Sequence, residues 1–151
     1  MTDPLNGPLE VGLRVLAILD AAYPDGMDVD RLSLLDHISL HTRDFGGPES
    51  ILPALPQRQS EISVGRARIE EGLQVMLRAQ LIDMTQSSEG LQYVASDSSS
   101  HFISLLESRY FDRLRESAQW AVERYRNISN VEVSRITSSL ATQRGQRGAG
   151  G

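Results

Sequence analysis

The sequence predicts a mainly α-helical protein that contains one small β-hairpin, and three observations lead to this prediction. Apolar residues recur at intervals of three and four over most of the chain, which is the period of an amphipathic helix. Residues 81–85 and 91–95 instead alternate loosely between apolar and polar, as strands do. The 151 residues include no cysteine, so an apolar core rather than disulfides must hold the fold together.

The first predicted helix covers residues 9–22. Its apolar side chains occupy nearly all of its surface, which is typical of a helix at the centre of a core. Gly12 interrupts this helix and costs up to about 1 kcal/mol relative to alanine, so we expect another segment to pack closely against it. Residues 23–26 (Tyr-Pro-Asp-Gly) then end the helix, because they favour a turn.

Two more helices are predicted before the hairpin. Asp28 or Asp30 is expected to cap a second helix that reaches about His41. A third helix is predicted over residues 63–80, where a broad apolar face alternates with arginine, glutamate and glutamine.

The hairpin and the segments after it complete the fold prediction. Gly90 provides a residue that tolerates positive φ in the hairpin loop. A short helix ending near Glu107 and a longer helix over residues 109–126 follow. This order of elements predicts a winged-helix-like domain over residues 1–127, with three helices and a two-strand wing, extended by C-terminal helices. We expect residues 128–151 to form a flexible or partly disordered C-terminal tail.

The connection from His41 to Glu61, between the second and third helices, is the most unusual segment of the sequence. Three prolines interrupt it and prevent a continuous helix: Pro48, Pro53 and Pro56. It also carries four large apolar side chains, namely Phe45, Ile51, Leu52 and Leu55. Disordered linkers are poor in such residues, so we expect this loop to dock, either on a partner or back on its own domain.

A winged helix also allows a DNA-binding interpretation. The third helix would enter the major groove, with Arg66, Arg68 and Arg78 as the candidate nucleic-acid contacts. However, Glu70 and Glu71 lie on the same helix, and the net charge of the chain is −5. DNA-binding proteins usually gather basic residues on one face, and these acidic features disfavour such a face. A winged-helix DNA-binding transcription regulator is therefore kept only as the alternative function.

The residue patterns do not predict an enzyme. The absence of cysteine excludes thiolate zinc sites, Fe–S clusters and a cysteine nucleophile, and no serine lies in a Gly-x-Ser-x-Gly pattern. The Gly46-Gly47-Pro48 sequence lacks the Gly-Lys-Ser/Thr ending of a phosphate loop. We therefore predict no catalytic residue, no cofactor and no metal site. No apolar run is long enough for a membrane span and no signal peptide is visible, so a cytoplasmic protein is expected.

Three motifs resemble those of a known bacterial family. The first is Asp44-Phe45-Gly46-Gly47-Pro48, followed by Leu52-Pro53-Ala54-Leu55-Pro56 and Arg58. The second is residues 69–73 (Ile-Glu-Glu-Gly-Leu) followed by Leu81-Ile82, and the third is residues 105–108 (Leu-Leu-Glu-Ser) leading to Tyr110. Over about residues 9–125 the chain resembles the second type of middle component of ABC-three-component (ABC-3C) conflict systems. Arg109 stands where this resemblance leads us to expect proline.

The resemblance implies an accessory protein rather than a catalyst. It implies a non-enzymatic adaptor between an ABC ATPase that resembles SMC and Rad50 proteins and an effector, often nuclease-like, in a Lamassu-like anti-phage or anti-plasmid defence. Trp120, the only tryptophan, is either a packing residue or a partner contact, since tryptophan is enriched at interfaces. The candidate partner-binding residues are Asp44, Phe45, Gly46, Gly47, Pro48, Ile51, Leu52, Leu55, Arg58 and Trp120.

Overall fold

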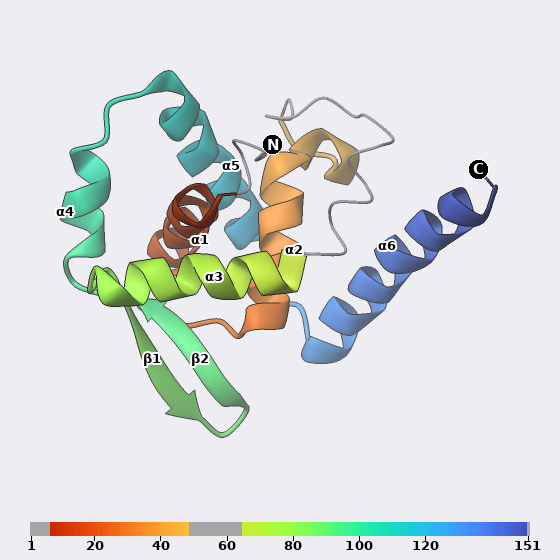
Figure 1. The fold of residues 1–151 in the computed structure, drawn as a ribbon, viewed down its shortest axis with the longest axis horizontal. Coiled ribbons are helices and arrows are strands. Elements are labelled where there is room, and N and C mark those ends of the chain that lie inside the picture. The colour runs from red at the N-terminus through yellow and green to blue at the C-terminus, as the bar shows by residue number, and fades with distance from the viewer. Residues whose placement is uncertain (1–6, 49–64, 151) are drawn as a thin grey trace.

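The computed structural model of the chain describes residues 7–48 and 65–150. Within these ranges the chain is mainly helical and contains one two-stranded antiparallel sheet, in a winged-helix-like arrangement (Figure 1), as the sequence predicts. The elements in chain order are α1 (Pro8–Ala22), α2 (Val29–Leu40), the 3-10 helix η1 (Thr42–Phe45), α3 (Gly65–Arg78), β1 (Ile82–Ser87), β2 (Gly90–Ala95), α4 (Ser99–Ser104), α5 (Arg109–Tyr125) and α6 (Asn130–Gly150).

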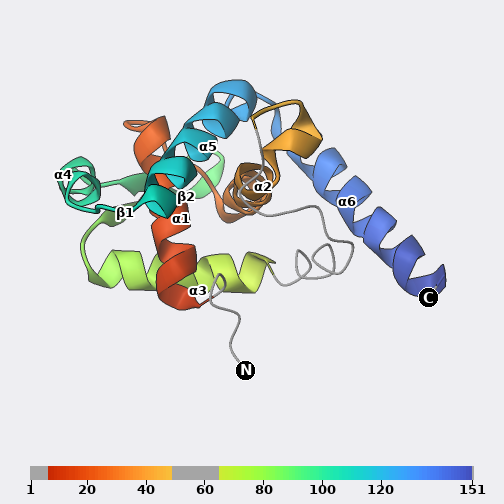
Figure 2. The same cartoon turned by 90° about the horizontal axis from the view of Figure 1, so that it is seen from above.

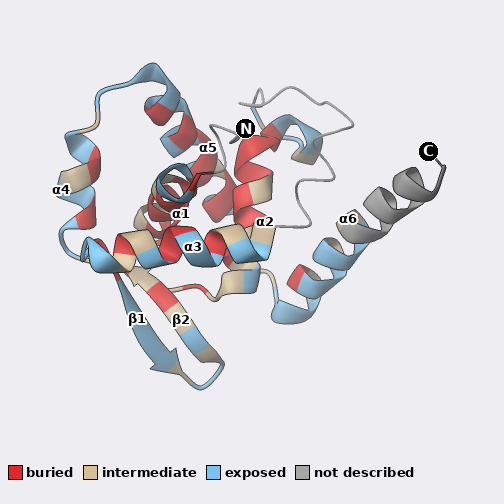
Figure 3. Cartoon of the chain, in the orientation of Figure 1, coloured by how far each residue is buried: buried red, intermediate tan, exposed pale blue. Residues whose placement is uncertain are grey.

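Helix α1 lies at the centre of the core, as its apolar sequence predicts. It packs against α2, α3, α4, α5 and β2, and nine of its 15 residues are buried (red in Figure 3). The predicted close approach at Gly12 is also confirmed. A Cβ at Gly12 would lie 3.0 Å from the carbonyl oxygen of Gly72 on α3, and a Cβ at Gly72 would lie 2.7 Å from the backbone nitrogen of Gly12. The two glycines therefore let the backbones of α1 and α3 cross in contact.

Helix α2 begins at one of the two predicted caps. The Asp28 side chain accepts a hydrogen bond of 2.8 Å from the backbone N–H of Arg31, so Asp28 rather than Asp30 is the N-cap. A buried ion pair joins α2 to α1: Arg14 donates from Nε to Asp36 Oδ1 at 2.7 Å and from Nη2 to Oδ2 at 3.2 Å. This bidentate pair satisfies two charged groups that the core removes from water.

The predicted hairpin is confirmed, and its strands are longer than expected because residues 86, 87 and 90 join the ladder. Gly90 has a φ of +111°, as expected for its place in the turn. Met27, which precedes α2, exchanges two backbone hydrogen bonds with Tyr93 of β2, at 2.8 and 2.9 Å. Gln80, with a φ of +61°, turns the chain sharply from α3 into the hairpin.

Helix α5 also starts as its sequence suggests. The hydroxyl of Ser108 accepts a hydrogen bond of 2.9 Å from the backbone N–H of Phe111, which caps the helix. Arg109 then takes the first helical position, where proline is also favoured, so the cap at Ser108 starts the helix without a proline. The apolar stripe of α5 packs against α1 and α2.

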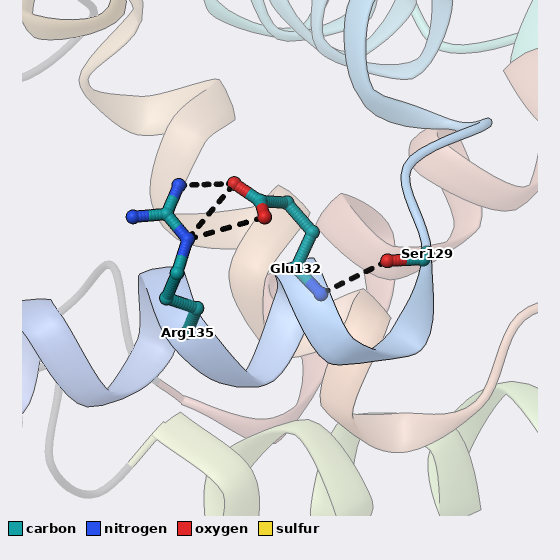
Figure 4. A network of polar contacts seen from close by, with 3 residues as sticks. All are labelled: Ser129, Glu132 and Arg135. Carbon is teal, nitrogen blue, oxygen red and sulfur yellow. Dashed lines mark hydrogen bonds and ion pairs between the residues drawn. The ribbon is translucent and has the colours of Figure 1, made fainter.

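The structure describes one more helix after residue 127. Helix α6 covers Asn130–Gly150, and the expectation of a flexible or partly disordered tail stays a prediction. Ser129 caps this helix by accepting a hydrogen bond from the backbone N–H of Glu132 at 3.1 Å, and Glu132 pairs with Arg135 (Figure 4). Val133 packs into the core. The domain boundary near residue 127 stays a prediction.

Ile136 and Leu140 of α6 also pack against the core, and the helix projects outward from the other helices toward its C-terminal end (Figure 2). Arg31 of α2 holds its base: the guanidinium donates to the carbonyl oxygen of Ile128 at 2.7 Å and to Asn130 Oδ1 at 3.1 Å. Within the described residues, no helix combines the length and the apolar character that a membrane crossing needs.

Candidate functional site

The described part of the unusual loop forms a closed turn after α2. Gly46 has a φ of +83°, in the left-handed region that favours glycine, and it ends η1. The backbone N–H of Gly47 donates to the carbonyl oxygen of Thr42 at 2.9 Å. The Thr42 hydroxyl donates to the carbonyl oxygen of Pro48 at 2.7 Å. Backbone carbonyl groups of η1 and the buried hydroxyl of Thr42 therefore hold the next three residues, Gly46 to Pro48, against η1.

This turn lies directly against α5. A Cβ at Gly47 would lie 2.6–2.7 Å from three ring carbons of Trp120, a distance that real Cβ atoms do not adopt. Glycine at position 47 therefore allows the loop backbone to contact the indole ring. The guanidinium carbon of Arg124 lies 5.8 Å from the centre of the Trp120 ring, within the range of a cation–π interaction.

Trp120 belongs to a group of rings that we call the aromatic cluster: His37, His41, Phe45, Trp120 and Tyr125. The Phe45 ring meets His37 edge-on with the ring centres 5.7 Å apart, and it meets Tyr125 edge-on at 6.2 Å. Trp120 and Tyr125 lie 6.3 Å apart. These edge-to-face contacts join α2 and η1, which are neighbours in sequence, to the distant helix α5.

The two histidines of the cluster lie side by side, with ring centres 4.8 Å apart. Burial lowers the pKa of His37 to about 3, and the neighbouring His41 contributes to the shift. His37 is therefore neutral at physiological pH and packs as an aromatic ring. Neutral imidazole is compatible with its place beside Phe45, whereas a charged ring would lose solvation there.

The structure describes six of the ten predicted partner-binding residues and places them close together. Phe45, Gly46, Gly47 and Pro48 meet at Trp120 or at the turn beside it, and Asp44 is exposed next to them. Phe45 packs on its own domain, in agreement with the interpretation in which the loop folds back. The other four predicted residues lie outside the described part of the chain: Ile51, Leu52, Leu55 and Arg58. Partner binding by any of them stays a prediction.

The candidate DNA contacts do not form one basic face. Arg66 pairs with Asp30 of α2 and, at 3.4 Å, with Glu70 of its own helix. Arg68 is half-buried, and Arg78 lies about 18 Å from Arg66 along the helix axis, given 1.5 Å per residue. The hairpin offers no second set of contacts, because residues 79–100 contain no arginine, lysine or histidine.

Sequence reasoning missed two arginines that organise the core. Arg14 is the one basic residue of the apolar helix α1, and that isolation signals a buried partner, although it does not identify Asp36. Arg126 donates to the carbonyl oxygen of Ala22 at 3.1 Å and to Asp25 at 2.8 Å, which holds the end of α1. Among the described residues, no group of three or more histidine, aspartate or glutamate side chains is placed to bind a metal ion.

Comparison with known proteins gives one match. No curated protein and no solved structure matched the chain. The family model described as "ABC-three component (ABC-3C) system Middle Component 2" matches residues 4–147 and thus nearly the whole sequence. The match includes the turn at Gly46-Gly47, the aromatic cluster, the hairpin and most of α6. The chain therefore belongs to the Middle Component 2 family of ABC-three-component systems.

Proposed function

We propose that this protein is a non-enzymatic adaptor subunit of a Lamassu-like anti-phage or anti-plasmid defence complex. In this proposal it links an SMC- or Rad50-like ABC ATPase to an effector subunit. Membership of a middle-component family supports a role within a system of several parts. The observation that carries the proposal is the turn formed by Gly46, Gly47 and Pro48. We call it the anchored turn, because Gly47 contacts the indole ring of Trp120.

The anchored turn fixes the position of Pro48, the last described residue before the proline-containing loop. Thr42 and Trp120 hold this end, and the described chain resumes at Gly65, where α3 begins. Pro53 and Pro56 fix φ, which reduces the conformational entropy that the loop loses when a partner orders it. In this proposal the anchored turn positions the loop, and its apolar residues contact the partner.

The partner contacts in this proposal are Ile51, Leu52, Leu55 and Arg58, which follow the anchored turn. Phe45 and Gly47 instead set the path of the loop, because both pack on the protein's own α2 and α5. The transcription-regulator alternative has less support, since Arg66 is already paired with Asp30 and the hairpin lacks basic residues. Cofactors play no part in the proposed function.

The test is co-purification of the tagged full-length chain with the ABC ATPase and the effector encoded beside it. We expect the ATPase to co-elute with wild type and to be lost from the double variant Leu52→Ser/Leu55→Ser. Leu105→Ser is the matched control, because Leu105 is an apolar residue that is 65% exposed outside the loop. Both variants should melt within a few degrees of wild type, which shows that any loss is not due to unfolding.

Two results would overturn the proposal. In the first, wild type purifies without the ATPase and the effector under conditions in which those two proteins are soluble. In the second, wild type shifts a DNA duplex at moderate salt, and Arg66→Ala/Arg68→Ala abolishes the shift, which would favour the regulator instead.

A further inference from the structure

The hairpin has one apolar face that continues beyond the core. The strand register places Ile82 opposite Ala95, Met84 opposite Tyr93 and Gln86 opposite Leu91. Side chains alternate between the two faces of a strand, so these six residues share one face. Ile82, Ala95 and Tyr93 are buried in the core, whereas Met84 is 54% exposed and Leu91 is 44% exposed. The outer half of an otherwise buried face is therefore uncovered by the described part of the chain.

The two edges of the hairpin also differ. The outer edge of β2 is engaged at Tyr93 by the backbone of Met27. The outer edge of β1 has no strand beside it among residues 7–48 and 65–150, and Figure 1 shows this hairpin extending from the body. A free edge presents unpaired backbone N–H and C=O groups that can bond to an additional strand.

Charge distinguishes the two faces that an added strand would meet. Asp83 and Thr85 lie on the face opposite to Met84, and Glu89 lies in the turn. Since residues 79–100 contain no basic side chain, this part of the surface carries only negative charge. A strand beside β1 would bury apolar side chains next to Met84 and would gain from basic side chains next to Asp83.

We propose that the free edge of β1 binds an extended segment of another component of the same system, with apolar residues on one face and basic residues on the other. This inference rests on the proposed function, because an adaptor that links two proteins needs a second surface. The twelve residues of α2 separate the Met27 bridge from η1 by about 18 Å, at 1.5 Å per residue. The base of the hairpin and the anchored turn therefore lie at opposite ends of α2.

A second copy of this chain is a less suitable occupant of the edge. Pairing between two β1 strands would bring together two segments that contain aspartate and no basic residue, so it would offer no opposite charge. Segments of like charge are disfavoured as neighbours in a sheet. Self-association through β1 is therefore a result that would contradict the proposal.

The test measures binding of the full-length chain to the co-encoded ATPase and, separately, to the co-encoded effector. We expect Met84→Glu/Leu91→Glu to weaken the affinity for one of these proteins by about tenfold or more, the effect typical of a central apolar contact. Leu105→Glu and Val131→Glu are matched controls, because both residues are exposed and apolar but lie outside the hairpin. Asp83→Arg is a second variant that leaves the apolar face intact, and it should weaken binding most at low salt.

Hydrogen exchange on the same complexes decides between the outcomes. Protection of the β1 amides on binding, together with loss of affinity in the hairpin variants only, is the expected result. If a complex forms while the β1 amides exchange as before and all variants bind equally, the edge proposal fails and the adaptor function stands. If neither protein binds wild type, both proposals fail. Concentration-dependent dimers with protected β1 amides would overturn the edge proposal in favour of self-association.

Discussion

The aromatic cluster and the hairpin differ in whether the rest of the protein covers their apolar side chains. At the aromatic cluster, Phe45 and Trp120 come from distant parts of the sequence, and both contact Tyr125, while Gly47 lies against Trp120. At the hairpin, the inner part of one face is buried in the core. Met84 and Leu91 form the outer part of the same face, which is exposed in the described chain. The apolar residues of the aromatic cluster are thus packed within the protein, whereas the outer residues of the hairpin are exposed. The sequence alone does not distinguish these two cases.

The largest expected effect comes from a comparison of two side-chain substitutions to alanine. Trp120→Ala removes a ring that packs against Gly47 and Tyr125, and we expect it to lower the free energy of unfolding by about 2–4 kcal/mol. Met84→Ala removes an exposed side chain, and we expect a change within about 0.5 kcal/mol. Urea unfolding measures both values. Equal losses for the two variants would mean that the hairpin face is covered by the chain itself.

The contact between the loop and α5 can be examined with two glycines of the same turn. Gly47→Ala should cost about 1–3 kcal/mol because the new methyl group meets the indole ring. Gly46→Ala should cost about 1–2 kcal/mol for a different reason, namely its positive φ, since its Cβ would meet open space.

A double-mutant comparison separates these two causes. In a Trp120→Ala background we expect the cost of Gly47→Ala to shrink toward zero and the cost of Gly46→Ala to persist. Denaturant unfolding of the three single variants and the two double variants measures both couplings. A cost at Gly47 that is unchanged without the indole would show that the loop backbone does not depend on Trp120.

The lowered pKa of His37 makes the stability of the aromatic cluster depend on pH. The pKa of His37 is about 3 in the folded protein and about 6.5 in an unfolded chain, so the native state favours the neutral form. The stability that His37 contributes is complete above pH 6.5 and is lost as the pH falls from about 6.5 toward 3. His37→Gln should therefore have a flatter dependence of unfolding free energy on pH over this range. Parallel curves for the variant and wild type would contradict the prediction.

The smallest effect is expected at the base of the hairpin. Gln80 adopts a φ of +61°, which glycine reaches without strain, so Gln80→Gly should raise the free energy of unfolding by about 0.5–1 kcal/mol. Arg78→Gly, two residues earlier within α3, is the control and should lower it by a similar amount. Thermal melting compares them. A loss of stability at both positions would mean that the side chain of Gln80 contributes more than its backbone strain costs.

Much of the fold could be predicted from the sequence because its signals are local. Apolar periodicity located α1, α2 and α5 to within one residue at most of their ends, and alternation with a glycine located the hairpin. Gly12 even predicted a close helix crossing, although its partner Gly72 was not identified. Helix α6 has a local signal too, since Ser129 and Glu132 form the Ser-x-x-Glu pattern of a helix start.

The candidate site was less predictable because its contacts join distant segments. The pattern of apolar residues indicates that Trp120 is partly buried, but it does not reveal that Gly47 is the neighbour that covers it. Likewise, Arg31 sits in the first turn of α2 and binds carbonyl groups nearly one hundred positions later. Predictions for Ile51, Leu52, Leu55 and Arg58 remain open, since these residues lie outside the described chain.

The contacts of Arg31 connect the two elements that project from the body of the protein, helix α6 and the hairpin. Helix α6 is fastened through Ile128 and Asn130 to Arg31, near the start of α2. Met27, just before that start, is bonded to Tyr93 of the hairpin. Arg31 also donates to the carbonyl oxygens of Tyr125 and Arg126, both at 3.3 Å. The start of α2 is therefore the point at which a pulling force on α6 is shared between the end of α5 and the base of the hairpin.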